Sequence, residues 1–206
     1  MTRARKATLQ RRFKPSEVRR EDLMNAAAEL FIAKGIEATT VDDIALKADA
    51  SKGTFYHYFP TKDDVLDSLR TRFTQDFLER VGAAVEACPA DDHVARLRCW
   101  LTTAATLYRA GYDLHDVVFH QHGRRRGYWA ERAAVTEQIA RIIENGRRDG
   151  TWSVRRPEMA AVVIYNGFHA IVDEAIEAGE KNVDDAMSEL AELFGNMLAP
   201  RQGPTG

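Results

Sequence analysis

The sequence predicts an all-α protein of about nine helices. Apolar residues recur at three-and-four spacing through most of its 206 residues, and no two alternating strand-like runs are joined by a hairpin dipeptide. Every proline stands where a helix would begin or end, and none needs to occupy a helix interior. The six prolines are Pro15, Pro60, Pro89, Pro157, Pro200 and Pro204.

The composition excludes several other classes of protein. With 45% hydrophobic residues and a net charge of −2, the chain is too apolar and too weakly charged to be disordered. The uncharged stretch 159–172 is too short for a membrane span, and no apolar segment follows the basic start as a secretory signal would require. An Arg-rich start also fits a transit peptide. The two cysteines, Cys88 and Cys99, indicate reduced thiols in a cytoplasmic protein.

Charge is distributed unevenly along the chain. Residues 1–20 carry eight Lys or Arg and one acid, whereas residues 60–206 carry 18 basic and 23 acidic side chains. A basic arm on a mildly acidic body favours contact with a polyanion at one end, although a merely solvated tail would look the same.

The N-terminal helices have clear start and stop signals. One apolar face and Gly35 define the first helix, over 16–34. Thr40 is expected to cap a short helix over 41–48, and Ser51 another over 52–58. Thr61 then begins a long helix that runs to about residue 87. Further helices are expected over 91–109, 113–122, 128–147, 157–178 and 183–198, separated by glycines and prolines.

Two short helices three or four residues apart, after a longer amphipathic helix, are typical of a helix-turn-helix. Apolar side chains hold the pair together: Val41, Ile44, Ala45 and Ala48 on the first short helix, and Phe55, Tyr58 and Phe59 on the second. The second helix then presents small polar or basic side chains without an acid, which suits a DNA major groove. This outward set is Ser51, Lys52, Thr54, Tyr56 and His57, with Gly53 leaving room for a phosphate backbone.

Here the sequence resembles the TetR family of bacterial transcriptional regulators. The residues that match the family's pattern are Thr40, Ile44, Ala45, Ala48, Ser51, Gly53, Phe55, Tyr56, Tyr58, Phe59 and Lys62. One departure is Asp49, where the family commonly has Gly, but Asp tolerates a left-handed backbone better than most residues.

The resemblance implies a role for each position in DNA binding. Lys52 and Thr54 would approach base edges, with Ser51 close by and Gly53 allowing close approach. Thr40, Tyr56, His57 and Lys62 would hold phosphates, and Arg11 and Arg12 would follow the minor groove or add charge.

The resemblance also implies a domain organisation. A basic flexible arm (1–15) and a three-helix helix-turn-helix DNA-binding domain (16–61) would precede a larger helical effector-binding and dimerisation domain (62–200) and a flexible tail (201–206). Family members pair through their last two helices, and one helix-turn-helix contacts too few base pairs alone, so a homodimer is expected. The interface candidates are Val162, Tyr165, Val172, Ile176, Leu190, Leu193, Phe194 and Met197.

The aromatic and histidine side chains of the C-terminal part suit an apolar or aromatic effector, although most aromatics at helical spacing only pack. The candidates are Trp100, Tyr108, Phe119, His120, Trp129, Tyr165, Phe168 and His169. The cluster Arg124–Arg126 leaves an anionic effector as an alternative. Asp116 and His120 share a helix face, but no recognised ligand spacing is completed, so we expect no metal and no cofactor.

The expected function is a ligand-responsive, sequence-specific regulator, a repressor released from a palindromic operator by a small molecule. A family member that activates, or that binds DNA together with its ligand, is one alternative, and a helical protein-interaction module is another. No phosphate loop, nucleophile elbow or zinc-protease motif points to an enzyme. A DNA-binding regulator without a membrane segment is expected in the cytoplasm.

Overall fold

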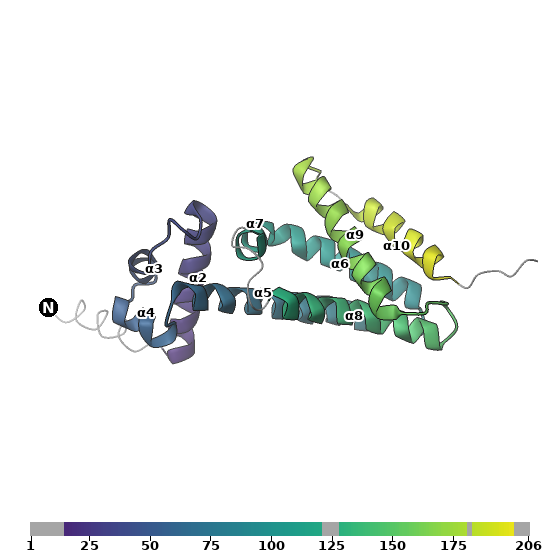
Figure 1. The fold of residues 1–206 in the computed structure, drawn as a ribbon, viewed down its shortest axis with the longest axis horizontal. Helices are drawn as coiled ribbons and strands as arrows, with labels where there is room; N and C mark the ends of the chain where they lie inside the picture. Colours follow the sequence, from purple (N-terminus) through teal and green to yellow (C-terminus); the bar gives the residue numbers. More distant parts are fainter. Residues whose placement is uncertain (1–14, 121–127, 181–182, 200–206) are drawn as a thin grey trace, which may run out of the picture. The chain divides into compact units, whose positions relative to one another are not determined.

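The computed structural model describes residues 15–120, 128–180 and 183–199 (Figure 1). All regular secondary structure in these ranges is helical, which confirms the all-α prediction. The elements are α2 (Ser16–Lys34), α3 (Val41–Lys47), α4 (Lys52–Tyr58), α5 (Lys62–Glu86), α6 (His93–Ala110), α7 (Tyr112–His115), the π-helical turn η1 (Asp116–His120), α8 (Tyr128–Arg148), α9 (Pro157–Glu177) and α10 (Asp184–Leu198).

One predicted helix has a different form. The segment expected as a single helix over 113–122 is the short α7 followed by the π-helical η1. The first fourteen residues of the predicted arm and the tail 201–206 lie outside the described residues.

The described chain forms two compact units. The N-terminal unit comprises residues 15–72 and 113–120, and the C-terminal unit comprises residues 73–112, 128–180 and 183–199. The division therefore falls inside α5, eleven residues beyond the boundary expected from the sequence, and the segment 113–120 packs with the N-terminal unit.

The N-terminal unit is held together by a core between α2, α3, α4 and the first half of α5. Phe31, Phe55 and Phe59 are almost fully buried at its centre. The remaining buried members are Leu23, Met24, Ala26, Ala27, Ala28, Ile36, Ile44, Ala48, Val65, Leu66, Leu69, Val117 and Val118. Arg70 is also buried, and its guanidinium donates to the carbonyl of Val118 in η1 and pairs with Asp67 at 3.0 Å. The buried aromatics leave the opposite face of α4 exposed.

Each short helix of this unit is capped by residues three apart. The Thr40 hydroxyl accepts from the Asp43 amide at 3.1 Å, and the Asp43 carboxylate accepts from the Thr40 amide at 2.9 Å, which is a complete capping box. Ser51 accepts from the Thr54 amide at 3.0 Å. At the start of α5, Thr61 accepts from the Asp64 amide at 3.2 Å. The three helix starts expected from the sequence are confirmed.

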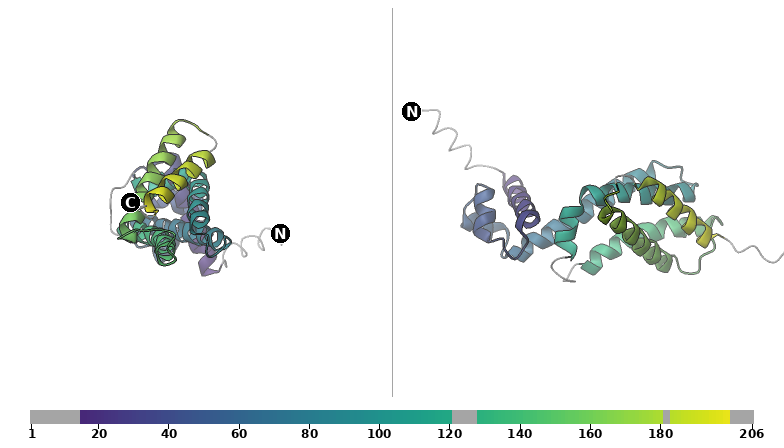
Figure 2. Two further views of the ribbon diagram at one scale, coloured as in Figure 1. Left: turned by 90° about the vertical axis from the view of Figure 1, so that its right-hand side faces the viewer. Right: turned by 90° about the horizontal axis from the view of Figure 1, so that it is seen from above.

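The C-terminal unit is a helical assembly in which α8 packs along α9, and α10 packs against both α6 and α9. Helices α9 and α10 run antiparallel side by side (Figures 1 and 2). They approach closely because Gly167 has no side chain: a Cβ there would lie 3.1 Å from the Phe194 ring. A buried aromatic core led by Trp100, Tyr108 and Phe168 fills the space between the helices.

Helix α9 is long and apolar enough, by length and composition, to cross a membrane. A core helix of a water-soluble protein passes the same test, and α9 buries Ala161, Ile164, Phe168 and Val172 in the core of its own unit. Its opposite side leaves Met159 and Val163 exposed. Helix α9 is therefore apolar on two faces, one packed against the core of its unit and one exposed.

Candidate DNA-binding surface and ligand region

The turn between α3 and α4 has the geometry that a helix-turn-helix requires. Asp49 adopts a left-handed backbone with φ of 51°, as expected for the position where the family pattern has Gly. The Ala50 amide donates to the Ala45 carbonyl at 2.9 Å, and Arg19 of α2 donates to the Asp49 carbonyl at 3.2 Å. The turn is therefore held both by its own backbone and by the preceding helix.

The two faces of α4 separate as the sequence predicted. Phe55 is fully buried, Phe59 is nearly so and Tyr58 is half-buried. On the other face Thr54 is half-buried, and the exposed residues are Ser51, Lys52, Gly53, Tyr56 and His57. No acidic residue lies in α4, so the outward face is polar and basic to neutral.

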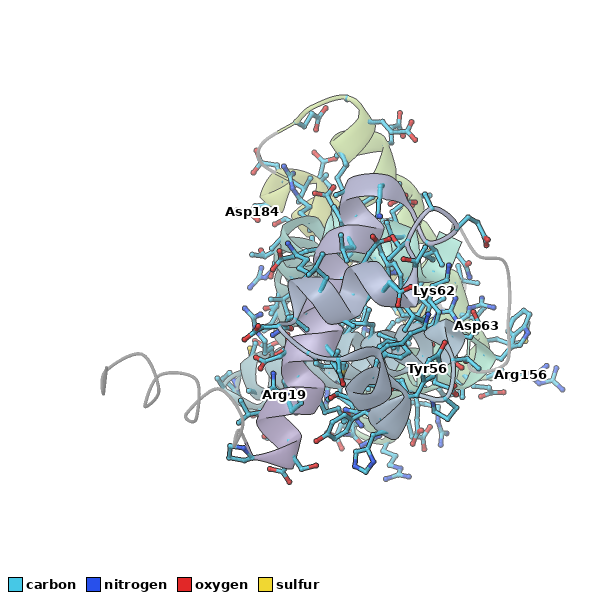
Figure 3. The ribbon with its side chains drawn as sticks, turned by 90° about the vertical axis from the view of Figure 1, so that its left-hand side faces the viewer. Arg19, Tyr56, Lys62, Asp63, Arg156 and Asp184 are labelled. Atoms are coloured by element: carbon cyan, nitrogen blue, oxygen red, sulfur yellow. The ribbon has the colours of Figure 1, made fainter. Side chains whose placement is uncertain are left out.

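Tyr56 lies on the exposed face with about half of its surface accessible (49%). Its ring packs edge-on against Phe55, with 5.5 Å between ring centroids. This contact holds the exposed Tyr56 ring against the buried Phe55 ring. The side chains of Arg19, Tyr56 and Lys62 in the N-terminal unit can be followed in Figure 3.

Lys52 is paired with a residue that the sequence reasoning missed. Its ammonium lies 3.0 Å from one oxygen of Asp42 in α3, and both side chains are exposed. The hydrogen bond and charge of Asp42 raise the pKa of Lys52. An exposed pair of this kind stabilises the fold only weakly, so exchanging Asp42 for a DNA group costs little. The sequence feature that could have indicated this pair is Asp42 itself, an acid in the first turn of α3.

Lys62 has a different environment from the other candidate phosphate contacts. Its ammonium donates to the carbonyls of Ile36 and Thr39, the second at 2.9 Å, and so ties the start of α5 to the loop before α3. Arg11 and Arg12 lie outside the described residues.

A capped α3, a left-handed turn and an acid-free exposed face on α4 define a helix-turn-helix protein. Residues 23–69 match the family model of bacterial regulatory proteins of the tetR family. The HTH-type transcriptional repressor KstR2 of Rhodococcus jostii (strain RHA1) is 30% identical over 140 residues, which cover 65% of this chain and 68% of that protein. The chain belongs to the tetR family and is a DNA-binding transcriptional regulator.

Solved structures share the fold over most of the chain. A tetR-family regulatory protein from Rhodococcus RHA1 superposes with a TM-score of 0.72 at 23% identity, covering 89% of this chain and 98% of that one. The regulator FadR of Bacillus subtilis, solved in complex with stearoyl-CoA, superposes with a TM-score of 0.74 at 20% identity, covering 84% and 96%.

Most of the candidate effector residues lie in one connected series of ring contacts in the C-terminal unit. Phe168 contacts both Trp100 and Tyr108, with centroid separations of 5.6 and 6.1 Å. His169 contacts Tyr108 at 5.0 Å and Tyr165 at 4.3 Å. The series therefore runs from the buried Trp100 outward to the half-buried Tyr165.

The polar ends of the inner rings are satisfied by distant partners. Trp100 Nε1 donates to Gln138 at 2.9 Å, and the Tyr108 hydroxyl donates to Asp173 at 2.8 Å. Burial and this hydrogen bond raise the pKa of Tyr108 above its ordinary value.

The remaining effector candidates lie elsewhere. Trp129 is mostly exposed, at 56%. Phe119 belongs to the N-terminal unit, where its ring contacts His115 at 4.7 Å, so it does not join the series. The side chain of His120 lies outside the described residues. Among the described residues, no group of three or more His, Cys, Asp and Glu could hold a metal ion.

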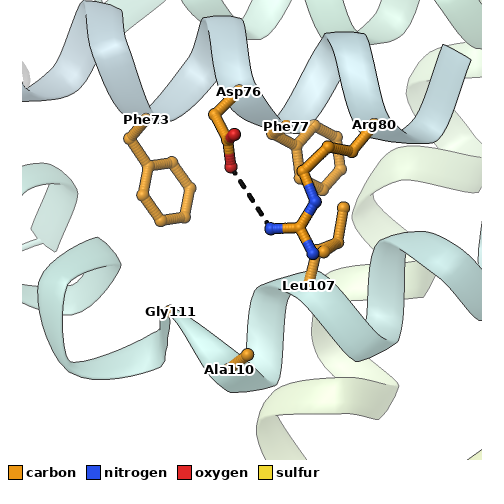
Figure 4. A pocket seen from close by; sticks show the side chains of 7 residues that line it. All are labelled: Phe73, Asp76, Phe77, Arg80, Leu107, Ala110 and Gly111. Atoms are coloured by element: carbon orange, nitrogen blue, oxygen red, sulfur yellow. Dashed lines mark hydrogen bonds and ion pairs between the residues drawn. The ribbon is translucent and has the colours of Figure 1, made fainter. Parts of the chain in front are cut away.

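A separate small cavity lies between α5 and α6. Its volume is about 160 Å³, below the roughly 300–1,000 Å³ typical of ligand pockets. An ion pair between Asp76 and Arg80, at 3.4 Å, borders it (Figure 4). Phe73, Phe77, Leu107, Ala110 and Gly111 complete its lining, so it contains none of the candidate effector residues.

The candidate interface residues divide by burial. Val172, Leu190 and Phe194 are buried in the unit's own core, which leaves them almost no surface for a partner. Tyr165 and Ile176 are half-buried. The exposed apolar side chains on α9 and α10 are Met159, Val162, Val163, Leu193 and Met197, of which the sequence reasoning missed Met159 and Val163.

Proposed function

We propose that this protein is a sequence-specific repressor that binds a palindromic operator as a homodimer and is released by a small-molecule effector. The observation that carries the proposal is the acid-free exposed face of α4, positioned by buried Phe55 and Phe59 in a tetR-family chain. The relative KstR2 is named a repressor, and the neighbour FadR was solved with stearoyl-CoA, which supports repression and an effector with a long apolar part.

The proposed contacts follow from exposure. Lys52 and Thr54 approach base edges, while Thr40, Tyr56 and His57 bind phosphates together with Arg11 and Arg12 of the arm. Gly53 lets the DNA backbone approach α4, and Ser51 caps the helix beside it. For Lys62, two bonds to backbone carbonyls support a positioning role.

The homodimer would form through the exposed apolar side chains of α9 and α10. Met159, Val162 and Val163 lie near the start of α9, and Leu193 and Met197 lie near the end of α10. Because the two helices are antiparallel, these ends lie together, and the Ser153 amide donates to the Leu198 carbonyl at 2.7 Å across them. A contiguous exposed apolar patch marks an association site. This regulator would act without catalysis in the bacterial cytoplasm, where its DNA is.

The test is selection of bound sequences from random DNA, followed by titration of the selected operator at fixed salt. We expect a two-fold symmetric site with half-sites about 34–36 Å apart. The double variant Lys52→Ala, Tyr56→Ala should lose at least about tenfold in operator affinity. Arg141→Ala in α8 removes a comparable exposed charge and should leave affinity unchanged. Unchanged affinity of the double variant would contradict the assignment of α4.

A further inference from the structure

Arg132, on α8, has an unusual environment for an arginine. It is half-buried, and its guanidinium carbon lies 5.7 Å from the Trp129 ring centroid and 5.4 Å from the Tyr165 ring centroid. All 31 Asp and Glu residues of the sequence lie within the described ranges, and none of them pairs with Arg132. The guanidinium is therefore held between two aromatic faces without an anion.

The other three arginines of α8 differ in this respect. Arg141, two and a half turns along α8, pairs with Glu137 at 3.3 Å. At the end of α8, Arg147 and Arg148 share Glu144 at 2.7 and 2.9 Å. The exposed arginines of α8 each have a carboxylate partner, whereas Arg132 has none in the described part of the chain.

Arg132 also stands at the outer end of the series of aromatic contacts. Tyr165, beside the guanidinium, contacts His169, which contacts Tyr108 in the core. This region therefore offers a ligand both a cation, the Arg132 guanidinium, and an apolar aromatic surface, the Tyr165 and His169 rings. Guanidinium forms paired hydrogen bonds with carboxylate, sulfonate and phosphate oxygens, and these are strongest where water is partly excluded.

We propose that Arg132 is the anion-recognition residue of the effector site, and that the effector is an amphipathic molecule with an aromatic or apolar body and an anionic group at one end. The proposal rests on the proposed ligand-responsive function. Trp129 and Tyr165 hold the guanidinium plane, and the half-buried rings of Tyr165 and His169 face the body of the ligand. An anionic effector was an alternative suggested by Arg124–Arg126, and the geometry of the described residues points to Arg132.

The experiment uses the full-length chain and two fluorescent probes with the same aromatic rings. One is 8-anilinonaphthalene-1-sulfonate, an anion, and the other is N-phenyl-1-naphthylamine, which is uncharged. Arg132→Gln should weaken binding of the sulfonate about tenfold to a hundredfold and change binding of the uncharged probe less than about twofold. Arg132→Lys should recover part of the loss, and Arg141→Gln is the matched control, with no effect on either probe.

Equal losses for both probes, or no loss for the sulfonate, would overturn the proposal. Competition then distinguishes the head group. Displacement of the sulfonate probe by dodecanoate alone assigns a carboxylate, displacement by dodecyl phosphate alone assigns a phosphate, and displacement by neither counts against an amphipathic anion.

This result is separable from the DNA-binding proposal. Without a probe present, Arg132→Gln should retain wild-type operator affinity and a wild-type melting temperature. The Lys52→Ala, Tyr56→Ala variant should in turn retain wild-type affinity for the sulfonate. If only the double variant loses operator binding, the DNA-binding proposal is supported even if Arg132 has no role in effector binding.

Discussion

The polar contacts that shape the candidate site of each unit span very different lengths of chain. In the N-terminal unit the caps join residues three apart, as in Thr40 with Asp43 and Ser51 with Thr54. In the C-terminal unit the hydrogen bond from Tyr108 to Asp173 spans 65 residues. Local pairs are visible in a sequence as motifs, whereas distant pairs are not. The exposed polar face of α4 could therefore be predicted, and the hydrogen bonds that position the aromatic side chains of the C-terminal unit could not.

The largest effect is expected where the distant contacts of the C-terminal unit converge. Phe168 is 1% exposed and packs against both Trp100 and Tyr108. Phe168→Ala should lower the free energy of unfolding by roughly 3–5 kcal/mol, because it removes buried area and leaves a cavity. Urea unfolding followed by circular dichroism measures this. Phe168→Leu keeps most of the volume and should cost much less, and a small cost for Phe168→Ala itself would show that the packing is loose.

Next in size is Gly146→Ala in α8, which tests how tightly that unit is packed. The added Cβ would lie 2.5 Å from the Trp152 ring and 3.1 Å from the His93 Cβ. The clash should lower stability by roughly 1–3 kcal/mol, which outweighs the gain of about 0.5–1 kcal/mol that Ala brings to a helix interior. The melting temperature should therefore fall, and a rise would mean that the Trp152 ring moves freely.

The local contacts of the N-terminal unit should each contribute less. Thr40→Ala removes the hydroxyl of the capping box while Asp43 remains, and should cost about 1 kcal/mol. Thr40→Ser keeps the hydroxyl and serves as the control in the same urea titration. If Thr40→Ala lowered the free energy of unfolding as much as Phe168→Ala does, the proposed difference between the two units would be wrong.

The same glycine substitution should have the opposite sign in α4. A Cβ at Gly53 meets only the Ser51 hydroxyl, at 3.7 Å, so nothing within the protein requires glycine there. Gly53→Ala should raise stability by about 0.5–1 kcal/mol and lower operator affinity, since the DNA backbone loses its close approach. Melting curves and operator titration on one preparation check both. Undiminished affinity would place the DNA backbone farther from α4.

The smallest effect is a pH dependence at the end of α8. Arg147, and then Arg148, lower the pKa of Glu144 to about 2. Because the folded pKa lies below the ordinary value of 4.5, the stabilisation is complete above pH 4.5 and is lost as pH falls toward 2. Glu144→Gln should reduce the fall in melting temperature between pH 6 and pH 3. Glu137→Gln removes a single exposed pair and is the control, and identical pH profiles would exclude a contribution from Glu144.

Much of the fold could be predicted because its signals are local. Thr40, Ser51 and Pro157 mark helix starts in the sequence and do so in the structure. The left-handed backbone of Asp49 was also expected from its place in the turn. These features depend on residues within one helical turn of each other, where spacing along the chain equals proximity in space.

The site was predictable to different degrees in the two units. The exposed face of α4 could be predicted once Phe55 was assigned to the core, because the helical period then places the remaining side chains on the opposite side. Asp42 and Arg132 were missed, since each acquires its role from side chains on another helix, Lys52 in one case and Tyr165 in the other. Leu190 was predicted to lie in the dimer interface, but it is buried in the core of its own unit. An apolar stripe on a helix does not indicate whether the same chain or a partner chain packs against it.

The sequence by itself determined the class of helices, their caps and the polar face of α4, since these depend on residues close together in the chain. Only the tertiary structure decided that Lys52 pairs with Asp42, that Lys62 binds two carbonyls and that Arg132 stands between two rings without an anion. The reason is physical. The interactions of a charged side chain depend on which groups the fold brings within a few ångströms of it, and packing between helices sets that distance.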